Sequence, residues 1–88
     1  APKASIIRGR VLRLVAARPA GMTATEAFDA YEQAHGELFG GLYSVAPRLS
    51  ELLKGGFVRR GETRGRRVAY VVTAAGLAWV QNTPEAAA

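Results

Sequence analysis

The 88-residue sequence contains no cysteine and a single histidine, His35. Disulfide bonds and cysteine-based zinc sites are therefore excluded, as are catalytic pairs of a thiol with an imidazole. The glycine-rich motifs of P-loop and dinucleotide-binding proteins are missing too. We place His35 at a solvated helix end, and we predict a protein that is not an enzyme and that uses no metal and no cofactor.

Long hydrophobic runs are also absent, although 49% of the residues are hydrophobic and 22% are charged. No apolar run reaches the length of a membrane span, and arginines interrupt the apolar residues of segment 1–18, as they would not in a signal peptide. We expect a cytoplasmic location and no membrane contact. The length suits one small domain, which we assign to residues 5–81, with flexible ends at 1–4 and 82–88.

Two segments of the chain each carry charged side chains of one sign only. Residues 1–18 hold five basic and no acidic side chains, whereas residues 19–47 hold four acidic and no basic ones. Residues 48–67 are basic again, and the chain has a net charge of +5. Segregated charge is typical of a protein with one basic surface, so it indicates an anionic partner. The alternative is a basic surface that serves solubility alone.

Apolar residues at helical spacing predict two helices in the first part of the chain. The first covers residues 5–18, with Ser5 as its N-cap. The second follows a capping box, in which Thr23 and Glu26 each accept the other's backbone amide, and Gly36 ends it. The residues expected to face the core are Ile7, Val11, Leu14 and Val15 in the first helix and Ala27, Phe28, Tyr31 and Ala34 in the second.

A third helix is expected to begin near Ser44. Pro47 would lie in its first turn, where a missing amide proton removes no hydrogen bond. The glycine-rich turn before this helix is expected to hold Leu38 and Phe39 inward. The core-facing stripe has the spacing i, i+4, i+7 and i+8 and consists of Val45, Leu49, Leu52 and Leu53.

The period then changes from helix to strand. The segment RRGETRGRRVAY, residues 59–70, places arginines around glycines and runs into β-branched and aromatic residues, which predicts a β-hairpin. We expect its tip at or near Thr63-Arg64-Gly65. Thr73 is expected to cap a short last helix. The residues that this helix would bring to the core are Leu77, Val80 and Trp79.

This order of elements resembles the winged helix-turn-helix domains of DNA-binding regulators, over roughly residues 5–80. The resemblance is carried by SVAPRLSELLKGGFVRRG, from the third helix into the first strand, and by the T-x-x-G-L pattern of Thr73, Gly76 and Leu77. It implies an α+β fold with a three-helix core, a two-stranded wing and a short C-terminal helix. It also implies a small transcriptional regulator or another DNA-organising protein. Small bacteriophage proteins often have this build, so a phage origin is an alternative.

The resemblance also implies the binding residues. In such domains the third helix enters the major groove of double-stranded DNA and the wing meets the backbone or the minor groove. The groove-facing candidates are Tyr43, Ser44, Pro47, Arg48, Ser50 and Glu51; the wing candidates are Arg59, Arg60, Thr63, Arg64, Arg66 and Arg67; and Arg8, Arg10 and Arg13 are further candidates for the backbone. Arg48 and Glu51 are alternatively an ion pair, and Glu51 would repel phosphate. Tyr43 is alternatively a core residue.

Other functions are compatible with the same resemblance. Winged helices also bind proteins, so the domain is alternatively an interaction module that modulates a partner, such as a host protein. Single-stranded nucleic acid ranks last, because the hairpin offers chiefly Tyr70 for stacking. A homodimer that binds two half-sites is a further alternative, and its pairing surfaces would be the first helix and the Trp79-bearing last helix.

Overall fold

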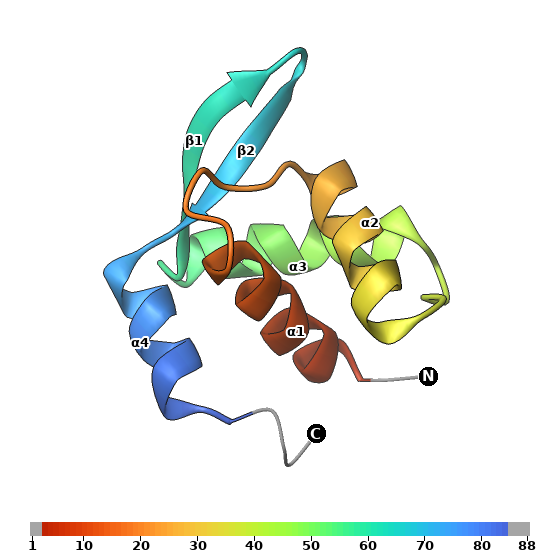
Figure 1. Cartoon of the computed structure of the whole chain (residues 1–88), viewed down its shortest axis with the longest axis horizontal. Helices are drawn as coiled ribbons and strands as arrows, with labels where there is room; N and C mark the ends of the chain where they lie inside the picture. The colour runs from red at the N-terminus through yellow and green to blue at the C-terminus, as the bar shows by residue number, and fades with distance from the viewer. Residues whose placement is uncertain (1–2, 85–88) are drawn as a thin grey trace.

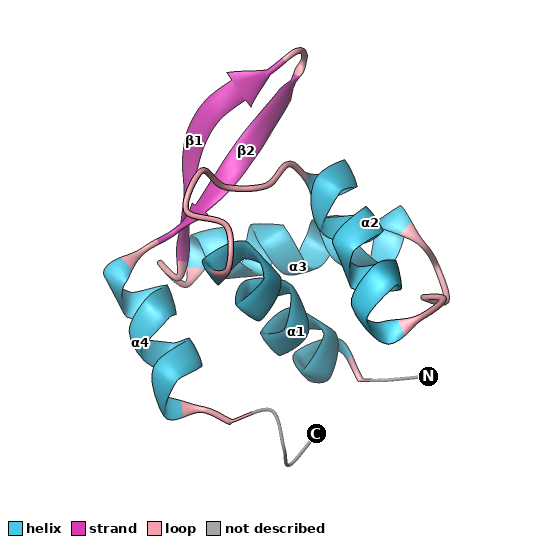
Figure 2. Cartoon of the chain, in the orientation of Figure 1, coloured by secondary structure: helices cyan, strands magenta, loops and turns pink. Residues whose placement is uncertain are grey.

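The computed structural model describes residues 3–84 as an α+β fold with four helices and a two-stranded antiparallel hairpin, as the sequence predicts. The elements are α1 (Ala4–Ala16), α2 (Ala24–His35), α3 (Leu42–Lys54), β1 (Val58–Arg64), β2 (Arg67–Val72) and α4 (Ala74–Asn82). The hairpin projects from a bundle of α1, α2 and α3, and α4 lies beside α1 (Figures 1 and 2). Of the flexible ends expected at 1–4 and 82–88, residues 1–2 and 85–88 lie outside the described residues, whereas Ala4 and Asn82 lie in helices.

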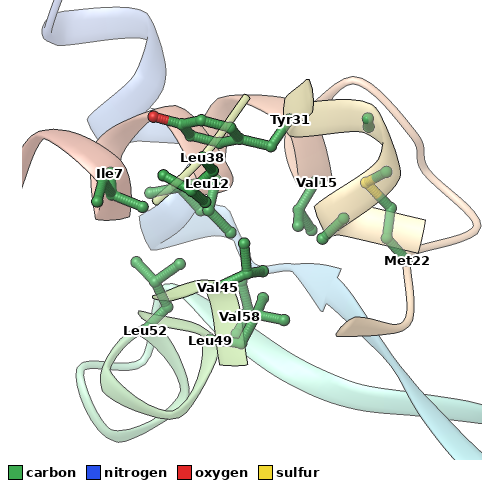
Figure 3. Packing of buried hydrophobic residues seen from close by; sticks show 13 residues of the cluster. Ile7, Leu12, Val15, Met22, Tyr31, Leu38, Val45, Leu49, Leu52 and Val58 are labelled. Carbon is green, nitrogen blue, oxygen red and sulfur yellow. The ribbon is translucent and has the colours of Figure 1, made fainter. Parts of the chain in front are cut away.

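The core lies between α1, α2 and α3 and is closed by the base of the hairpin (Figure 3). Most of the predicted stripe residues are buried, namely Ile7, Val11, Val15, Ala27, Tyr31, Val45, Leu49 and Leu52. Of the others, Leu14, Phe28 and Leu53 are half-buried and Ala34 is exposed. Leu12 is buried although it lies beside the predicted stripe, because α2, α3, α4 and β2 all contact α1. These contacts make α1 the centre of the fold. Burial of each large aliphatic side chain there contributes roughly 1.5–3 kcal/mol to the stability of the folded state.

The cap of α2 forms as predicted, whereas that of α1 does not. The Thr23 hydroxyl accepts the Glu26 amide at 3.2 Å, and the Glu26 carboxylate accepts the Thr23 amide at 2.9 Å. Helix α1 has Lys3 at its N-cap without a side-chain cap, so Ser5 lies inside the helix. The Ser5 prediction was wrong because the chain becomes helical from Ala4 onward.

Helix α3 begins two residues before the predicted start at Ser44. The amides of Tyr43 and Ser44 donate to the carbonyls of Gly40 and Gly41 at 3.1 and 3.0 Å. These glycines have φ values of 87° and 55°, which other residues rarely adopt. Pro47 consequently lies in the second turn of the helix and not in the first. In that position its missing amide proton leaves the Tyr43 carbonyl without its helical hydrogen bond.

The hairpin turns slightly later than the sequence predicts. Arg64 pairs with Arg67, which leaves Gly65 and Arg66 as a two-residue turn. Gly65 has a φ of 63°, which suits glycine at the first central position of such a turn. Thr63 and Arg64 therefore lie in β1 and not at the tip.

A bridge that the sequence did not predict attaches the hairpin to the bundle. Met22 and Tyr70 exchange two backbone hydrogen bonds of 3.0 and 2.7 Å, on the edge of β2 opposite β1. Met22 is fully buried. A Cβ atom at Gly21 would lie 2.7 Å from the Tyr70 carbonyl oxygen, so the chain can pass β2 this closely only without a side chain there.

The T-x-x-G pattern at the start of α4 is a packing device. The Thr73 hydroxyl accepts the Gly76 amide at 3.1 Å, and the Thr73 amide donates to the Phe57 carbonyl at 3.1 Å. Gly76 is buried, and a Cβ atom there would collide with that same carbonyl oxygen. Leu77 is exposed and does not reach the core. Val80 is half-buried and packs against the core. The pattern thus fixes how α4 leaves the hairpin.

Candidate nucleic-acid interface

Exposed basic side chains are concentrated from the end of α3 into the hairpin. Residues 54–67 hold six basic side chains and one acidic side chain, Glu62. Five of the basic ones are exposed and have no ion-pair partner anywhere in residues 3–84, namely Lys54, Arg59, Arg60, Arg66 and Arg67. Like charges this close repel one another, so an anion bound beside them would be stabilised.

Arg64 is the basic residue of the hairpin that points back to the bundle. One of its nitrogens donates to the Glu26 carboxylate at 2.6 Å and to the Gly21 carbonyl at 3.3 Å. The other donates to the Ala20 carbonyl at 2.9 Å. Arg64 therefore ties β1 to the loop before α2, whereas the resemblance implies that it contacts DNA.

Glu26 connects this tie to the capping box. The hydrogen bond from the Thr23 backbone, and then the charge and hydrogen bond of Arg64, lower the pKa of Glu26 below its usual value of 4.5. A carboxyl group with a lowered pKa in the folded state stabilises the fold above its unfolded pKa. The stabilisation is present above about pH 4.5 and is lost as the pH falls through the folded value.

We expect Glu26→Gln to lower the free energy of unfolding by about 1 kcal/mol at neutral pH, because a neutral amide weakens the cap and the tie to Arg64. The variant should also lose less stability than the parent on acidification to about pH 3.5, because it has no such carboxylate to protonate. Urea unfolding at the two pH values measures both effects. Asp29→Asn is the control, since Asp29 lies exposed on the same helix. An equal acid response in Glu26→Gln and the parent would contradict this role of Glu26.

The exposed face of α3 forms a stripe that leads into the hairpin. Tyr43, Pro47, Ser50 and Lys54 are exposed at the spacing i, i+4, i+7 and i+11, so they lie along one side of the helix. Only three residues separate the end of α3 from the start of β1. The structure therefore brings three of the predicted groove-facing side chains and the basic hairpin into one continuous surface.

Arg48 does not belong to this stripe. Its Nε and Nη2 atoms donate to the two oxygens of Glu51 at 2.9 and 2.8 Å, and Arg8 of α1 adds a third bond at 2.9 Å. The Arg48 side chain is only 17% exposed. The hydrogen bonds from Arg48 and then from Arg8 lower the pKa of Glu51 below its usual 4.5. The ion pair that the spacing suggested is thus present, and it joins α3 to α1.

Two aromatic side chains are exposed at the start of α3. Phe39 is 87% exposed and Tyr43 is 89% exposed, so Tyr43 is not a core residue. The expected inward position is correct for Leu38, which is buried, and wrong for Phe39. The hydroxyl of Ser44, itself a predicted DNA contact, donates to the Phe39 carbonyl at 2.7 Å and fixes the turn.

The remaining arginines of α1 make contacts within the protein. Arg10 donates to the Tyr31 hydroxyl at 3.1 Å. Arg13 donates to the Thr83 carbonyl at 2.5 Å and lies over the Trp79 ring, 5.0 Å from its centroid. These side chains hold α1 against the rest of the protein. The resemblance implies instead that they contact the DNA backbone.

Two further features, a metal cluster and a helix that could span a membrane, are absent from the described residues. Residues 3–84 contain no cluster of three histidine or acidic side chains that suits a metal ion, and none of their helices is long and apolar enough to cross a membrane. His35 is exposed at the end of α2, with its ring 4.9 Å from that of Tyr31. Comparison with known proteins adds no assignment: no family model, no curated protein and no solved structure matches this chain.

Proposed function

We propose that the protein binds double-stranded DNA in the manner of a winged helix-turn-helix domain and regulates transcription. In this arrangement α3 enters the major groove, with Tyr43, Pro47 and Ser50 toward the base edges, and the hairpin is the wing. The observation that carries the proposal is the group of exposed hairpin arginines without ion-pair partners among residues 3–84. The short connection from α3 to β1 supports simultaneous contact of both elements with one duplex.

The distribution of charge favours a double-stranded ligand that lies along one side of the molecule. Residues 19–47, which include α2, contain no lysine or arginine, so they offer no cationic side chain to a phosphate backbone. Tyr70, the aromatic residue of the hairpin, is half-buried and its backbone is bonded to Met22, which disfavours stacking of single-stranded bases. Neutralising about five phosphates gives a log–log salt slope of roughly −4 to −5.

A selection from randomised duplexes at about 0.15 M salt tests the proposal. We expect an enriched motif, whose symmetry reports whether one or two copies of the chain bind. The affinity for the selected duplex should fall steeply with salt, as measured by fluorescence anisotropy. Failure to enrich any motif would refute sequence-specific binding, and a flat salt dependence would refute the role of the hairpin arginines.

Phe39 and Tyr43 favour a second candidate, a protein-interaction module. Their exposure exceeds that of every other large apolar residue described, and acidic side chains precede them in the sequence. A partner protein that covered them would gain hydrophobic contact at little cost in ordering, because hydrogen bonds already fix the turn. On this candidate the basic hairpin would not be the principal binding element.

Phe39→Ser separates the two candidates. The substitution should preserve the fold, because the side chain is 87% exposed. If DNA is the ligand, we expect duplex affinity to change less than about twofold, because Phe39 lies outside the stripe on α3. If a protein is the ligand, capture of that protein should fall more than about tenfold. Leu77→Ser is the matched control, since it removes an exposed leucine from α4.

A further inference from the structure

A cavity of about 330 Å³ opens between α1, the end of α3 and α4. Its lining consists of Ser5, Arg8, Gly9, Leu12, Leu52, Phe57 and Trp79. Sites for small molecules have volumes of roughly 300–1,000 Å³ and mostly apolar walls, with a few polar groups that orient the ligand. This cavity has the same character, and none of its residues belongs to the exposed stripe of α3 or to the hairpin strands.

The aromatic wall of the cavity is held in place. Arg13 lies over the Trp79 ring and also donates to the Thr83 carbonyl, so the indole has a cation on one face. On the α1 side a Cβ atom at Gly9 would lie only 3.0 Å from Cη2 of Trp79. Glycine inside a helix costs about 1 kcal/mol relative to alanine. Gly9 therefore allows α1 and Trp79 to approach closely, and the wall exists before any ligand binds.

Arg8 is the charged residue of the cavity lining, and its ion-pair partner lies beside the cavity. Arg8 and Arg48 share the single carboxylate of Glu51, so two positive charges face one negative charge next to the cavity. Arg48 engages both carboxylate oxygens, whereas Arg8 makes one bond from one nitrogen. The Arg8 side chain is 41% exposed, and a guanidinium has five N–H donors, so several remain for another anion.

We propose that this cavity binds a small apolar carboxylic acid. Its ring or chain would lie against Trp79, Phe57 and Leu12, and its carboxylate would accept hydrogen bonds from Arg8. The positive charge of Arg8, whose partner Glu51 is shared with Arg48, selects an acid over a neutral compound of the same shape. The proposal does not depend on DNA binding, although Leu52 places the occupant in contact with α3.

The single tryptophan of the chain provides the measurement, because it lines the cavity. We would titrate the protein, without DNA, with 3-phenylpropanoate and with 3-phenylpropan-1-ol, which has the same ring and chain but no charge. The acid should produce a saturable change in Trp79 fluorescence with a Kd of about 0.1–1 mM, and the alcohol should bind at least about tenfold more weakly. No saturation up to about 10 mM acid, or equal affinity for the two compounds, would overturn the proposal.

Two variants locate the bound acid. Arg8→Met keeps an apolar side chain but removes the charge, so the acid should lose its advantage over the alcohol. Arg18→Met is the charge-matched control, because Arg18 is exposed and does not line the cavity. If loss of the bond to Glu51 unfolds Arg8→Met, Ser5→Phe serves instead: it fills the rim from an exposed position and should block both compounds. Unchanged acid binding in the folded variants would place the acid elsewhere and overturn the assignment. Because these titrations contain no DNA, their failure leaves the proposed function standing.

Discussion

Replacement of Arg60, Arg66 and Arg67 together by alanine is expected to reduce duplex affinity by about 100-fold or more at about 0.15 M salt. These side chains are exposed and have no ion-pair partner within the described chain, so the substitutions should preserve the fold. The log–log salt slope should become shallower by about three units, because three phosphate contacts disappear. Anisotropy titrations at several salt concentrations measure the affinity and the slope, and circular dichroism checks the fold.

A charge-matched comparison separates a placed contact from a general effect of net charge. Lys3→Glu lowers the net charge by two units at the start of α1, at the far side of the bundle from the hairpin tip (Figure 1). The double variant Arg66→Ala with Arg67→Ala lowers it by the same amount at the hairpin. We expect the double variant to weaken binding several-fold more than Lys3→Glu. Equal losses would favour the general basic surface, and undiminished affinity in the triple variant would refute the hairpin as a DNA contact.

Arg64 is left in place in these variants because of its contacts. Its guanidinium holds Glu26 and the carbonyls of Ala20 and Gly21, so its removal would shift the hairpin as well as remove a charge. A loss of DNA affinity in Arg64→Ala would therefore not identify a phosphate contact. The sequence alone does not reveal that Arg64 contacts Glu26 and the loop before α2, because these partners lie about 40 residues away in the chain.

The elements that the sequence predicts correctly depend on local chemistry. The capping box needs only Thr23 and Glu26, three residues apart. Three of the four stripe residues of α3 are buried because helical periodicity places them on one face. The T-x-x-G pattern begins α4 because Thr73 satisfies the Gly76 amide within one turn. Such features form between residues a few positions apart, so they depend little on how the rest of the chain packs.

The features that the sequence misses depend on how distant segments pack. Arg8 and Glu51 are 43 residues apart, and the pair exists only because α1 crosses α3 at that level. The bridge of Met22 to Tyr70 involves one residue pair, which leaves no strand pattern to detect. The Arg64 position had a usable signal: a two-residue turn with glycine first places the tip at Gly65 and Arg66, and Arg64 then belongs to the strand.

Gly76→Ala is expected to destabilise the protein by about 3 kcal/mol or more, which for a domain of this size lowers Tm by roughly 15 °C. The new methyl group would collide with the carbonyl oxygen of Phe57 and would lie 2.9 Å from Cγ2 of Val72. The carbonyl cannot move aside easily, because it accepts the Thr73 amide at 3.1 Å. Helix α4 would have to shift as a unit, and the packing of Val80 and Trp79 would loosen with it.

Helix propensity alone predicts that Gly76→Ala would stabilise the protein, so the sign of the measured stability change separates the two effects. Alanine is favoured over glycine inside a helix by up to about 1 kcal/mol, so an uncrowded site would gain stability. Gly9→Ala provides the contrast on α1, because the nearest atoms to its new methyl group are the ends of the Trp79 and Arg13 side chains, at 3.0 and 3.2 Å. These side-chain ends need to shift only slightly to make room, unlike the Phe57 carbonyl, so we expect a change smaller than about 1 kcal/mol there.

Thermal and urea unfolding followed by circular dichroism compare the two variants. A Gly76→Ala protein as stable as the parent would show that α4 does not need this close contact with Phe57, and the role assigned to the T-x-x-G pattern would then be wrong.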